Sequence, residues 1–249
     1  MRCCGITDIG KVRELNEDSF AIKTIQEYNI VVAVVADGMG GHNAGEVASV
    51  CATDTMIALV EDAAKYFKNY SDKQICDFLK NAVNKINKII YNKASESQNM
   101  SGMGTTVVCC IVYNNKCYIA NVGDSRLYKF NKQLTQITKD HSYVWELVQM
   151  GVITNEQAKD HPNKNVITKA VGTEKTVIPD TFIEKIKSGD YFLLCSDGLV
   201  NMVSDDDITK VMLNDSDIKD KVTTLVELAK ENGGKDNITL VMLKSETEA

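Results

Sequence analysis

Two apolar stretches of this chain run into the same dipeptide, Asp-Gly. The stretch IVVAVVADGMGG carries Asp37 and Gly38, and YFLLCSDGL carries Asp197 and Gly198. A third carboxylate, Asp236, stands where a strand is expected to open in GGKDNITLVML. Carboxylates at strand ends, backed by Val, Ile and Leu, are costly to desolvate unless they are paired or bind a metal. Three such oxygen donors on one rim predict a site for two divalent cations, which usually performs phosphoester chemistry.

The segments that must position these residues predict an α+β protein. Residues 18–25 and 29–36 have the pattern of a β-hairpin that ends at Asp37. Two long amphipathic helices follow, one from about Ala44 and one from Ser71, where Ser-x-x-Gln forms a capping box. No strand separates these helices, and this favours a helical layer over a sheet rather than alternating βαβ units.

The middle of the chain predicts short strands. The segments TTVVCCIVY, KCYIANVGD, RLYKF and QLTQIT are separated by short turns, which indicates antiparallel pairing. Residues from about 141 to 165 are polar and broken, and predict short helices in a surface insertion. VITKAV, DTFIEKI and DYFLLCS are expected to return to strand. Ser204 then caps a helix, and a last helix stops at Asn232-Gly233-Gly234 before the final strand.

The expected sheet can gather five aspartates on one rim. In an antiparallel sheet, the end of one strand lies beside the start of its neighbour. Asp37, Asp124 and Asp197 are expected to close strands, whereas Asp18 and Asp236 are expected to open them. All five can therefore share one edge of a β-sandwich.

Composition limits the class of protein. The 249 residues are 44% hydrophobic and include only two prolines, which favours one domain over residues 1–249 with a sizeable core and no linker. A net charge of −6 argues against a general nucleic-acid binder. The longest apolar run, residues 30–36, is far shorter than the roughly 20 residues of a membrane helix, and MRCCGITDIG lacks a signal-peptide core. We therefore expect a cytoplasmic protein that binds no membrane, and a monomer, because no coiled coil or extended apolar repeat occurs.

The cysteines do not suggest a metal site. There are eight of them, and none forms a Cys-x-x-Cys pair, so zinc is not expected. We interpret all eight as reduced and mostly buried thiols.

Eight motifs follow one another between about Arg13 and Thr239: RELNEDS, VADGMGGH, SGMGTT, NVGDSRLY, KDHS, HPNKNVITKAVG, LCSDGL and KDNIT. Together they resemble the bacterial, single-domain branch of the metal-dependent (protein phosphatase 2C-type) serine/threonine phosphatases. The resemblance implies a four-layer αββα sandwich, in which helices flank two packed antiparallel sheets. It also implies metal-dependent hydrolysis of phosphoserine and phosphothreonine in proteins. The insertion at about 141–165 resembles the family's flap, which borders the metal cleft and influences substrate selection.

The same resemblance implies the metal ligands. Asp37 would bridge two Mn²⁺ or Mg²⁺ ions, Asp197 and Asp236 would bind the first ion, and the carbonyl of Gly38 would bind the second. The bridge would let both ions acidify one shared water, which then attacks phosphorus in line. From the residues alone, each Asp-Gly also fits a plain turn.

Three further residues belong to the implied site. Asp18, with Glu17 beside it, would hold waters of the second ion. Asp124 matches a ligand of a third ion, shared with Asp197, although a structural Gly-Asp-Ser turn explains it equally. Arg13 resembles the family's phosphate-clamping arginine, since a planar fork of donors suits a pair of phosphate oxygens. A surface arginine is the alternative.

The leaving serine or threonine alkoxide needs a proton. Many eukaryotic relatives have a histidine directly after the first Asp-Gly, but this chain has Met39 there, so that role does not transfer. We expect metal-bound water to donate instead. His42 is a candidate for a substrate or helix-entry role, and His161 in the insertion is a candidate for contact with substrate.

Two other functions stay open at this point. An inactive phosphoprotein-binding regulator would be favoured by lost metal ligands, but the three central aspartates and Arg13 are intact. A nucleotide-binding α/β enzyme fits poorly, because Gly38-Met39-Gly40 continues to Asn43 rather than glycine and no GxxxxGK[ST] occurs. By resemblance, we expect the partners to be phosphorylated proteins, including a bacterial serine/threonine kinase and its substrates.

Overall fold

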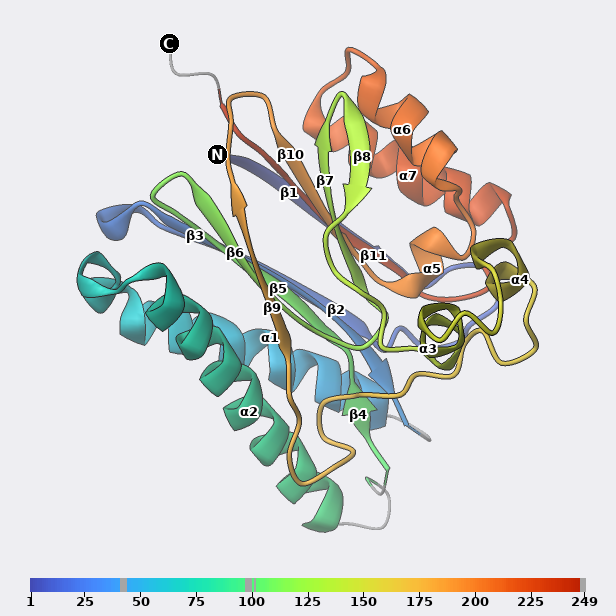
Figure 1. Ribbon diagram of the computed structural model, residues 1–249, viewed down its shortest axis with the longest axis horizontal. Helices are drawn as coiled ribbons and strands as arrows, with labels where there is room; N and C mark the ends of the chain where they lie inside the picture. Colours follow the sequence, from blue (N-terminus) through green and yellow to red (C-terminus); the bar gives the residue numbers. More distant parts are fainter. Residues whose placement is uncertain (41–43, 97–99, 101, 247–249) are drawn as a thin grey trace.

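The computed structural model describes residues 1–40, 44–96, 100 and 102–246. Two antiparallel sheets pack face to face, and helices cover the outer side of each sheet (Figure 1). This four-layer αββα arrangement confirms the expected fold class.

One sheet has five strands, and the other has five strands in order with a short sixth strand attached. The first sheet has the order β1 (Arg2–Asp8), β11 (Ile238–Lys244), β10 (Tyr191–Cys195), β7 (Arg126–Asn131) and β8 (Gln133–Gln136). The second sheet has the order β2 (Asp18–Ile25), β3 (Ile30–Met39), β5 (Val107–Tyr113), β6 (Lys116–Val122) and β9 (Asp180–Lys185), and the short β4 (Gly104–Thr105) pairs with the end of β3. Every pair of neighbouring strands is antiparallel.

The helices form two outer layers and one insertion. The second sheet is covered by α1 (Ala44–Ala63) and α2 (Asp72–Glu96), which are joined by η2 (Ala64–Asn69), while η1 (Gln26–Tyr28) closes the β2–β3 hairpin. The first sheet is covered by α5 (Asp197–Val200), α6 (Asp205–Leu213) and α7 (Ile218–Glu231). As expected, the insertion contains short helices, α3 (Tyr143–Gln149) and α4 (Asn155–Lys159), which lie at one end of the sandwich (Figure 1).

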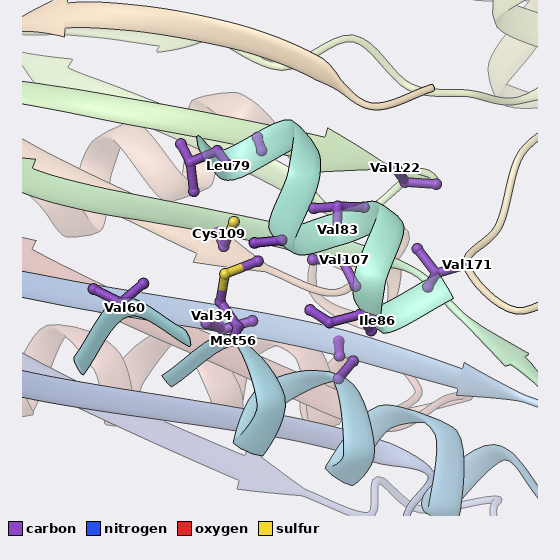
Figure 2. Close-up of a cluster of buried hydrophobic side chains, with 14 of the residues drawn as sticks. Val34, Met56, Val60, Leu79, Val83, Ile86, Val107, Cys109, Val122 and Val171 are labelled. Carbon is purple, nitrogen blue, oxygen red and sulfur yellow. The ribbon is translucent and has the colours of Figure 1, made fainter. Parts of the chain in front are cut away.

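Side chains along β3 alternate between two faces of the sheet. Both faces are buried, and this explains why the sequence of the strand is continuously apolar. Val34 points toward α1 and α2, where it shares a cluster with Met56 and Leu79 (Figure 2). Its neighbours Ala33 and Val35 point into the layer between the two sheets. Both faces of β3 are therefore buried, and the strand that carries Asp37 lies in the centre of the molecule.

Two expectations were wrong, one about the pairing of two strands and one about the existence of a strand. β6 and β7 do not pair, because the turn at residues 123–125 carries the chain from the second sheet to the first. The segment VITKAV is not a strand, and it makes only isolated bridges, Ile167 with Ser142 and Val171 with Thr105. Short turns therefore predicted the hairpins correctly but could not reveal a turn that changes sheets.

Two remaining features bear on the sequence-based expectations. All eight cysteines are free thiols, as expected, but only four of them are buried, at positions 109, 110, 117 and 195. Among the described residues, no helix has both the length and the apolar character that a membrane span requires.

Candidate active site

Asp37 lies at the centre of a group of acidic side chains. Asp18 is its direct partner in the β2–β3 ladder. Burial is the main cause that raises the pKa of the Asp37 carboxyl, and the charges of Asp18, Asp197, Asp124 and Asp236 add to the shift. The structure therefore brings together the five aspartates that the sequence predicted to share one rim.

The local positions of these aspartates differ in detail from the expectation. Asp37 lies within β3, two residues before its end at Met39. Asp197 is the first residue of α5 rather than the last of β10, and Asp236 lies two residues before β11. Asp124 lies in the turn that follows β6. Asp197 and Asp124 therefore approach Asp37 from the start of a helix and from a turn rather than from the ends of strands.

The glycine of each Asp-Gly pair allows two backbone segments to meet. A Cβ atom on Gly38 would collide with the carbonyl oxygens of Gly45, at the start of α1, and Glu17. A Cβ atom on Gly198 would collide with the carbonyl oxygen of Asn237. The first glycine thus brings α1 against β3, and the second brings Asp197 against the segment that carries the third aspartate.

Two threonines hold the backbone of Asp37. The Asp37 carbonyl accepts bonds from Thr106 N–H at 2.8 Å and from the Thr105 hydroxyl at 2.9 Å, and Asp37 N–H donates to Thr106 Oγ1 at 2.9 Å. Thr106 Oγ1 also lies 2.7 Å from Ser125 Oγ, next to Asp124. These bonds orient Asp37 through its peptide groups, so they do not compete with ligands of its carboxylate.

Asp18 is joined to the other sheet by hydroxyl groups. Its side chain is almost fully buried, and the Ser196 hydroxyl donates to Asp18 Oδ2 at 2.7 Å. Ser196 Oγ in turn accepts from Thr239 N–H at 3.0 Å. Burial raises the pKa of Asp18 to about 7, hydrogen bonds from Ser196 and Thr239 oppose the shift, and the charges of Asp197 and Asp236 add to it.

Burial and mutual repulsion act on the rest of the group. Burial, followed by the charge of Asp236, raises the pKa of Asp197 to about 6. Burial, followed by the charge of Asp197, raises the pKa of Asp124 to about 8. Desolvation is also the main cause that lifts the pKa of Asp37 well above its ordinary value. Divalent cations would relieve this repulsion, and carboxylate oxygens are the donors that Mg²⁺ and Mn²⁺ prefer.

The acidic side chains do not form a closed metal cage. In the part of the chain that the structure describes, no group of three or more carboxylate, histidine or thiol side chains is arranged to hold an ion. Mg²⁺ commonly keeps several waters and takes only one or two carboxylates from the protein. The carboxylates present are therefore compatible with a hydrated cation.

Arg13 reaches the acidic group from the loop between β1 and β2. Its Nη2 lies 2.8 Å from Asp236 Oδ2, and about half of its side chain is exposed. The hydrogen bond to Asp236 is the main cause that raises the pKa of Arg13. A guanidinium has five N–H donors, so this contact leaves capacity for an oxyanion at the mouth of the site.

Two histidines were predicted as candidates for contact with substrate or for helix entry. His42 lies outside the described residues. His161 makes contacts local to the insertion: its ring centroid lies 5.9 Å from that of Tyr143, and its Nδ1 accepts from Asn163 N–H at 3.1 Å. Met150 and Val152 of the insertion are 73% and 64% exposed, so they present apolar surface to solvent.

Sequence reasoning missed the side chains that support the aspartates. Thr106, Ser196 and Asn237 each stand within a motif, and Ser196 and Asn237 also stand next to an aspartate that was assigned a role, so this placement was the available signal. Asn87, in α2, had none. It accepts from Gly172 N–H at 2.7 Å and donates to the Glu174 carbonyl at 3.0 Å, which anchors on α2 the segment that follows the insertion.

The sequence matches known proteins over most of its length. The protein phosphatase 2C family matches residues 10–241. The serine/threonine phosphatase stp of Listeria monocytogenes is 38% identical over 240 residues, which cover 96% of this chain and 93% of that protein. Protein phosphatase PhpP of Streptococcus pneumoniae is 34% identical over 252 residues, which cover 98% of this chain and 97% of that protein.

Solved structures show the same fold. The serine/threonine phosphatase Stp1 from Staphylococcus aureus superimposes with a TM-score of 0.89 at 41% identity, covering 98% of this chain and 95% of that one. The serine/threonine phosphatase PstP/Ppp of Mycobacterium tuberculosis gives a TM-score of 0.85 at 34% identity, with 99% of both chains covered.

Proposed function

Because the chain belongs to the protein phosphatase 2C family and is a protein serine/threonine phosphatase, we propose that its five clustered aspartates hold the Mn²⁺ or Mg²⁺ ions on which this metal-dependent family relies. The observation that carries the proposal is the convergence on Asp37 of four other carboxylates, each of which raises its pKa. The enzyme hydrolyses phosphoserine and phosphothreonine in proteins, so phosphoproteins are its substrates.

The proposed site would hold two ions, and a third is possible in principle. Asp37 would bind both of the first two ions, Asp197 and Asp236 would bind one of them, and the Gly38 carbonyl would bind the other. Asp18 would hold water of the second ion, and Asp124 would bind a third ion together with Asp197. When bound, the ions supply Lewis-acid activation of a water nucleophile and neutralise phosphate charge.

The protein's own groups orient the substrate. Arg13 presents its guanidinium to two phosphate oxygens, and its position beside Asp236 supports this role. Thr105 and Thr106 hold Asp37 by its backbone, which fixes the point from which its carboxylate extends. Met39, after the first Asp-Gly, carries no transferable proton, which excludes that position as the acid for the leaving alkoxide.

The biological assignment is also a proposal. The whole chain, 1–249, acts as one catalytic domain with a flap at about 141–165. It acts as a monomer on a bacterial serine/threonine kinase and on the substrates of that kinase. The intact aspartates favour the active enzyme over an inactive phosphoprotein-binding regulator.

The test is phosphate release from a phosphothreonine peptide, measured with Mn²⁺ and again with excess EDTA. Turnover should require the metal, and Asp37→Ala or Asp197→Ala should abolish it. Asp54→Ala, at an exposed carboxylate of α1, is the matched control and should retain full activity. Full activity in either site variant, or no Mn²⁺ binding by calorimetry, would overturn the metal assignment.

A further inference from the structure

Asn237 directly follows the metal-site residue Asp236, yet its side chain binds a different part of the protein. Only 5% of Asn237 is exposed. Its Oδ1 accepts from Glu17 N–H at 2.9 Å, and its Nδ2 donates to the carbonyls of Ile9 at 3.0 Å and Leu15 at 2.9 Å. The amide thus uses its oxygen and both of its N–H groups on one loop, the β1–β2 loop that carries Arg13.

These three bonds fall on both sides of Arg13. Ile9 lies four residues before it, Leu15 lies two residues after it, and Glu17 lies four residues after it. A single side chain therefore holds the two arms of the loop at one point. The tip of the loop, residues 11–15, is exposed, so burial in the core does not hold it.

The backbone around Asn237 adds to this attachment. Lys11 N–H donates to the Gly234 carbonyl at 2.7 Å. Gly10 has a φ of +78° and lies so close to the Asp236 carbonyl that a Cβ atom would collide with it. Arg13 returns to the same segment through its ion pair with Asp236. Residues 234–237 therefore form a platform for the Arg13 loop.

We propose that Asn237 is the positioning residue for the phosphate-binding arginine, Arg13, and that it sets the guanidinium against the metal-site aspartate beside it. The inference rests on the proposed function, in which Arg13 binds substrate phosphate. A planar guanidinium recognises two phosphate oxygens only in one orientation, and an exposed loop would lose that orientation in solution. The dipeptide Asp-Asn thus serves two parts of one site: Asp236 faces the ions, and Asn237 holds the loop.

The test uses inorganic phosphate as a competitive inhibitor of the Mn²⁺-loaded enzyme. Asn237→Asp keeps the acceptor oxygen and removes both donors, whereas Asn237→Ala removes the group without adding charge beside Asp236. Loss of two neutral hydrogen bonds should raise the phosphate inhibition constant and the peptide KM about tenfold or more. Asn232→Ala is the matched control. Asn232 lies at the end of α7, and its side chain donates to the Met202 carbonyl rather than to the loop.

A double-mutant cycle separates positioning from general stability. If Asn237 acts through Arg13, Asn237→Ala should raise the phosphate inhibition constant in the native background and leave it unchanged in Arg13→Ala. Mn²⁺ affinity by calorimetry should stay close to that of the Asn232→Ala control. The unfolding temperature of Asn237→Ala should fall, because three hydrogen bonds are lost, so all variants are assayed well below it.

Four outcomes would overturn the inference. Additive effects of the two substitutions, or an unchanged inhibition constant in folded Asn237→Ala, would separate Asn237 from the phosphate. Failure of both Asn237 variants to fold would assign the side chain to stability alone. An Arg13→Ala enzyme with unaltered phosphate affinity would remove the proposed role of Arg13 itself, and the inference with it, even if turnover still required Mn²⁺.

Discussion

Asp18 and Asp37 lie directly opposite each other in the antiparallel β2–β3 ladder. Like charges in directly opposed positions of a sheet destabilise it. Three further aspartates act on the same point, so the arrangement costs stability unless protons or cations neutralise it. The cost is concentrated where the proposed chemistry takes place, which is typical of functional sites.

The first prediction concerns stability without metal. The raised pKa values of Asp197, Asp18 and Asp124, about 6, 7 and 8, exceed the roughly 3.9 of an unfolded aspartate. Between about pH 4 and 8 the folded state therefore binds more protons than the unfolded state, and the free energy of unfolding contributed by these groups falls as pH rises. In EDTA, thermal unfolding should occur at lower temperature at pH 8 than at pH 5.5, and Mn²⁺ should restore stability most at pH 8.

The control for this prediction removes one charge. Burial lowers the pKa of His141, so this residue makes the free energy of unfolding rise with pH, opposite to the aspartates. The aspartates are therefore tested by comparing the native protein with a variant that keeps His141. Asp37→Asn should reduce the dependence of the unfolding temperature on pH in EDTA. An identical dependence in native protein and Asp37→Asn would contradict the repulsion argument.

The second prediction separates activity from stability at Asp37. Asn has the shape of Asp and leaves the bonds from Thr105 and Thr106 intact, because they involve the Asp37 backbone. Asp37→Asn should lower kcat/KM on the order of 10³-fold and raise the unfolding temperature of the metal-free protein at pH 8. Parallel loss of activity and metal-free stability would mean that the side chain has a structural role. Asp54→Asn is the exposed control.

The third prediction concerns Asn87, which anchors on α2 the segment that follows the insertion. Asn87→Ala removes the bonds to Gly172 N–H and the Glu174 carbonyl, and leaves both peptide groups beside a buried helix face. It should lower the free energy of unfolding by about 2 kcal/mol and speed limited proteolysis in residues 166–179, the segment between the insertion and β9. Asn84→Ala, one turn earlier on the exposed side of α2, should change the free energy by less than about 0.5 kcal/mol. Equal effects of the two substitutions in urea unfolding would refute the anchor.

The fourth prediction concerns a buried lysine that has a structural role and no part in the proposed active site. Lys221 is 1% exposed, and its Nζ donates to the carbonyls of Val211 and Met212, both at 3.0 Å, and of Asn214, at the end of α6. Lys221→Met keeps the apolar stem and removes the cation from this helix C-terminus. Unfolding should become easier by about 1–3 kcal/mol while kcat and KM stay unchanged. Lys219→Met, at an exposed position, should be silent in both measurements.

Local patterns in the sequence determined much of the fold. The alternation in β3 and the hairpin with β2 depend on side chains a few residues apart, and both were predicted. The same holds for the capping box in which Ser71 N–H donates to Gln74 Oε1, and for Ser204, whose hydroxyl accepts from Asp207 N–H. The candidate metal-binding aspartates were recognisable for a related reason. A charged residue beside an apolar strand stands out within a short stretch of sequence.

Contacts between distant segments were decided only by the tertiary structure. The Gly-Asp-Ser turn has the composition of a hairpin turn, yet it joins two sheets, because the strands it connects find better partners elsewhere. Asn87 has no local signature, and the place of Asn237 next to Asp236 does not reveal its partners. The backbone groups that these two side chains bind lie 85 and 220 or more residues away. An amide can satisfy many partners, and only the packing of the two sheets and their helices selects which ones it meets.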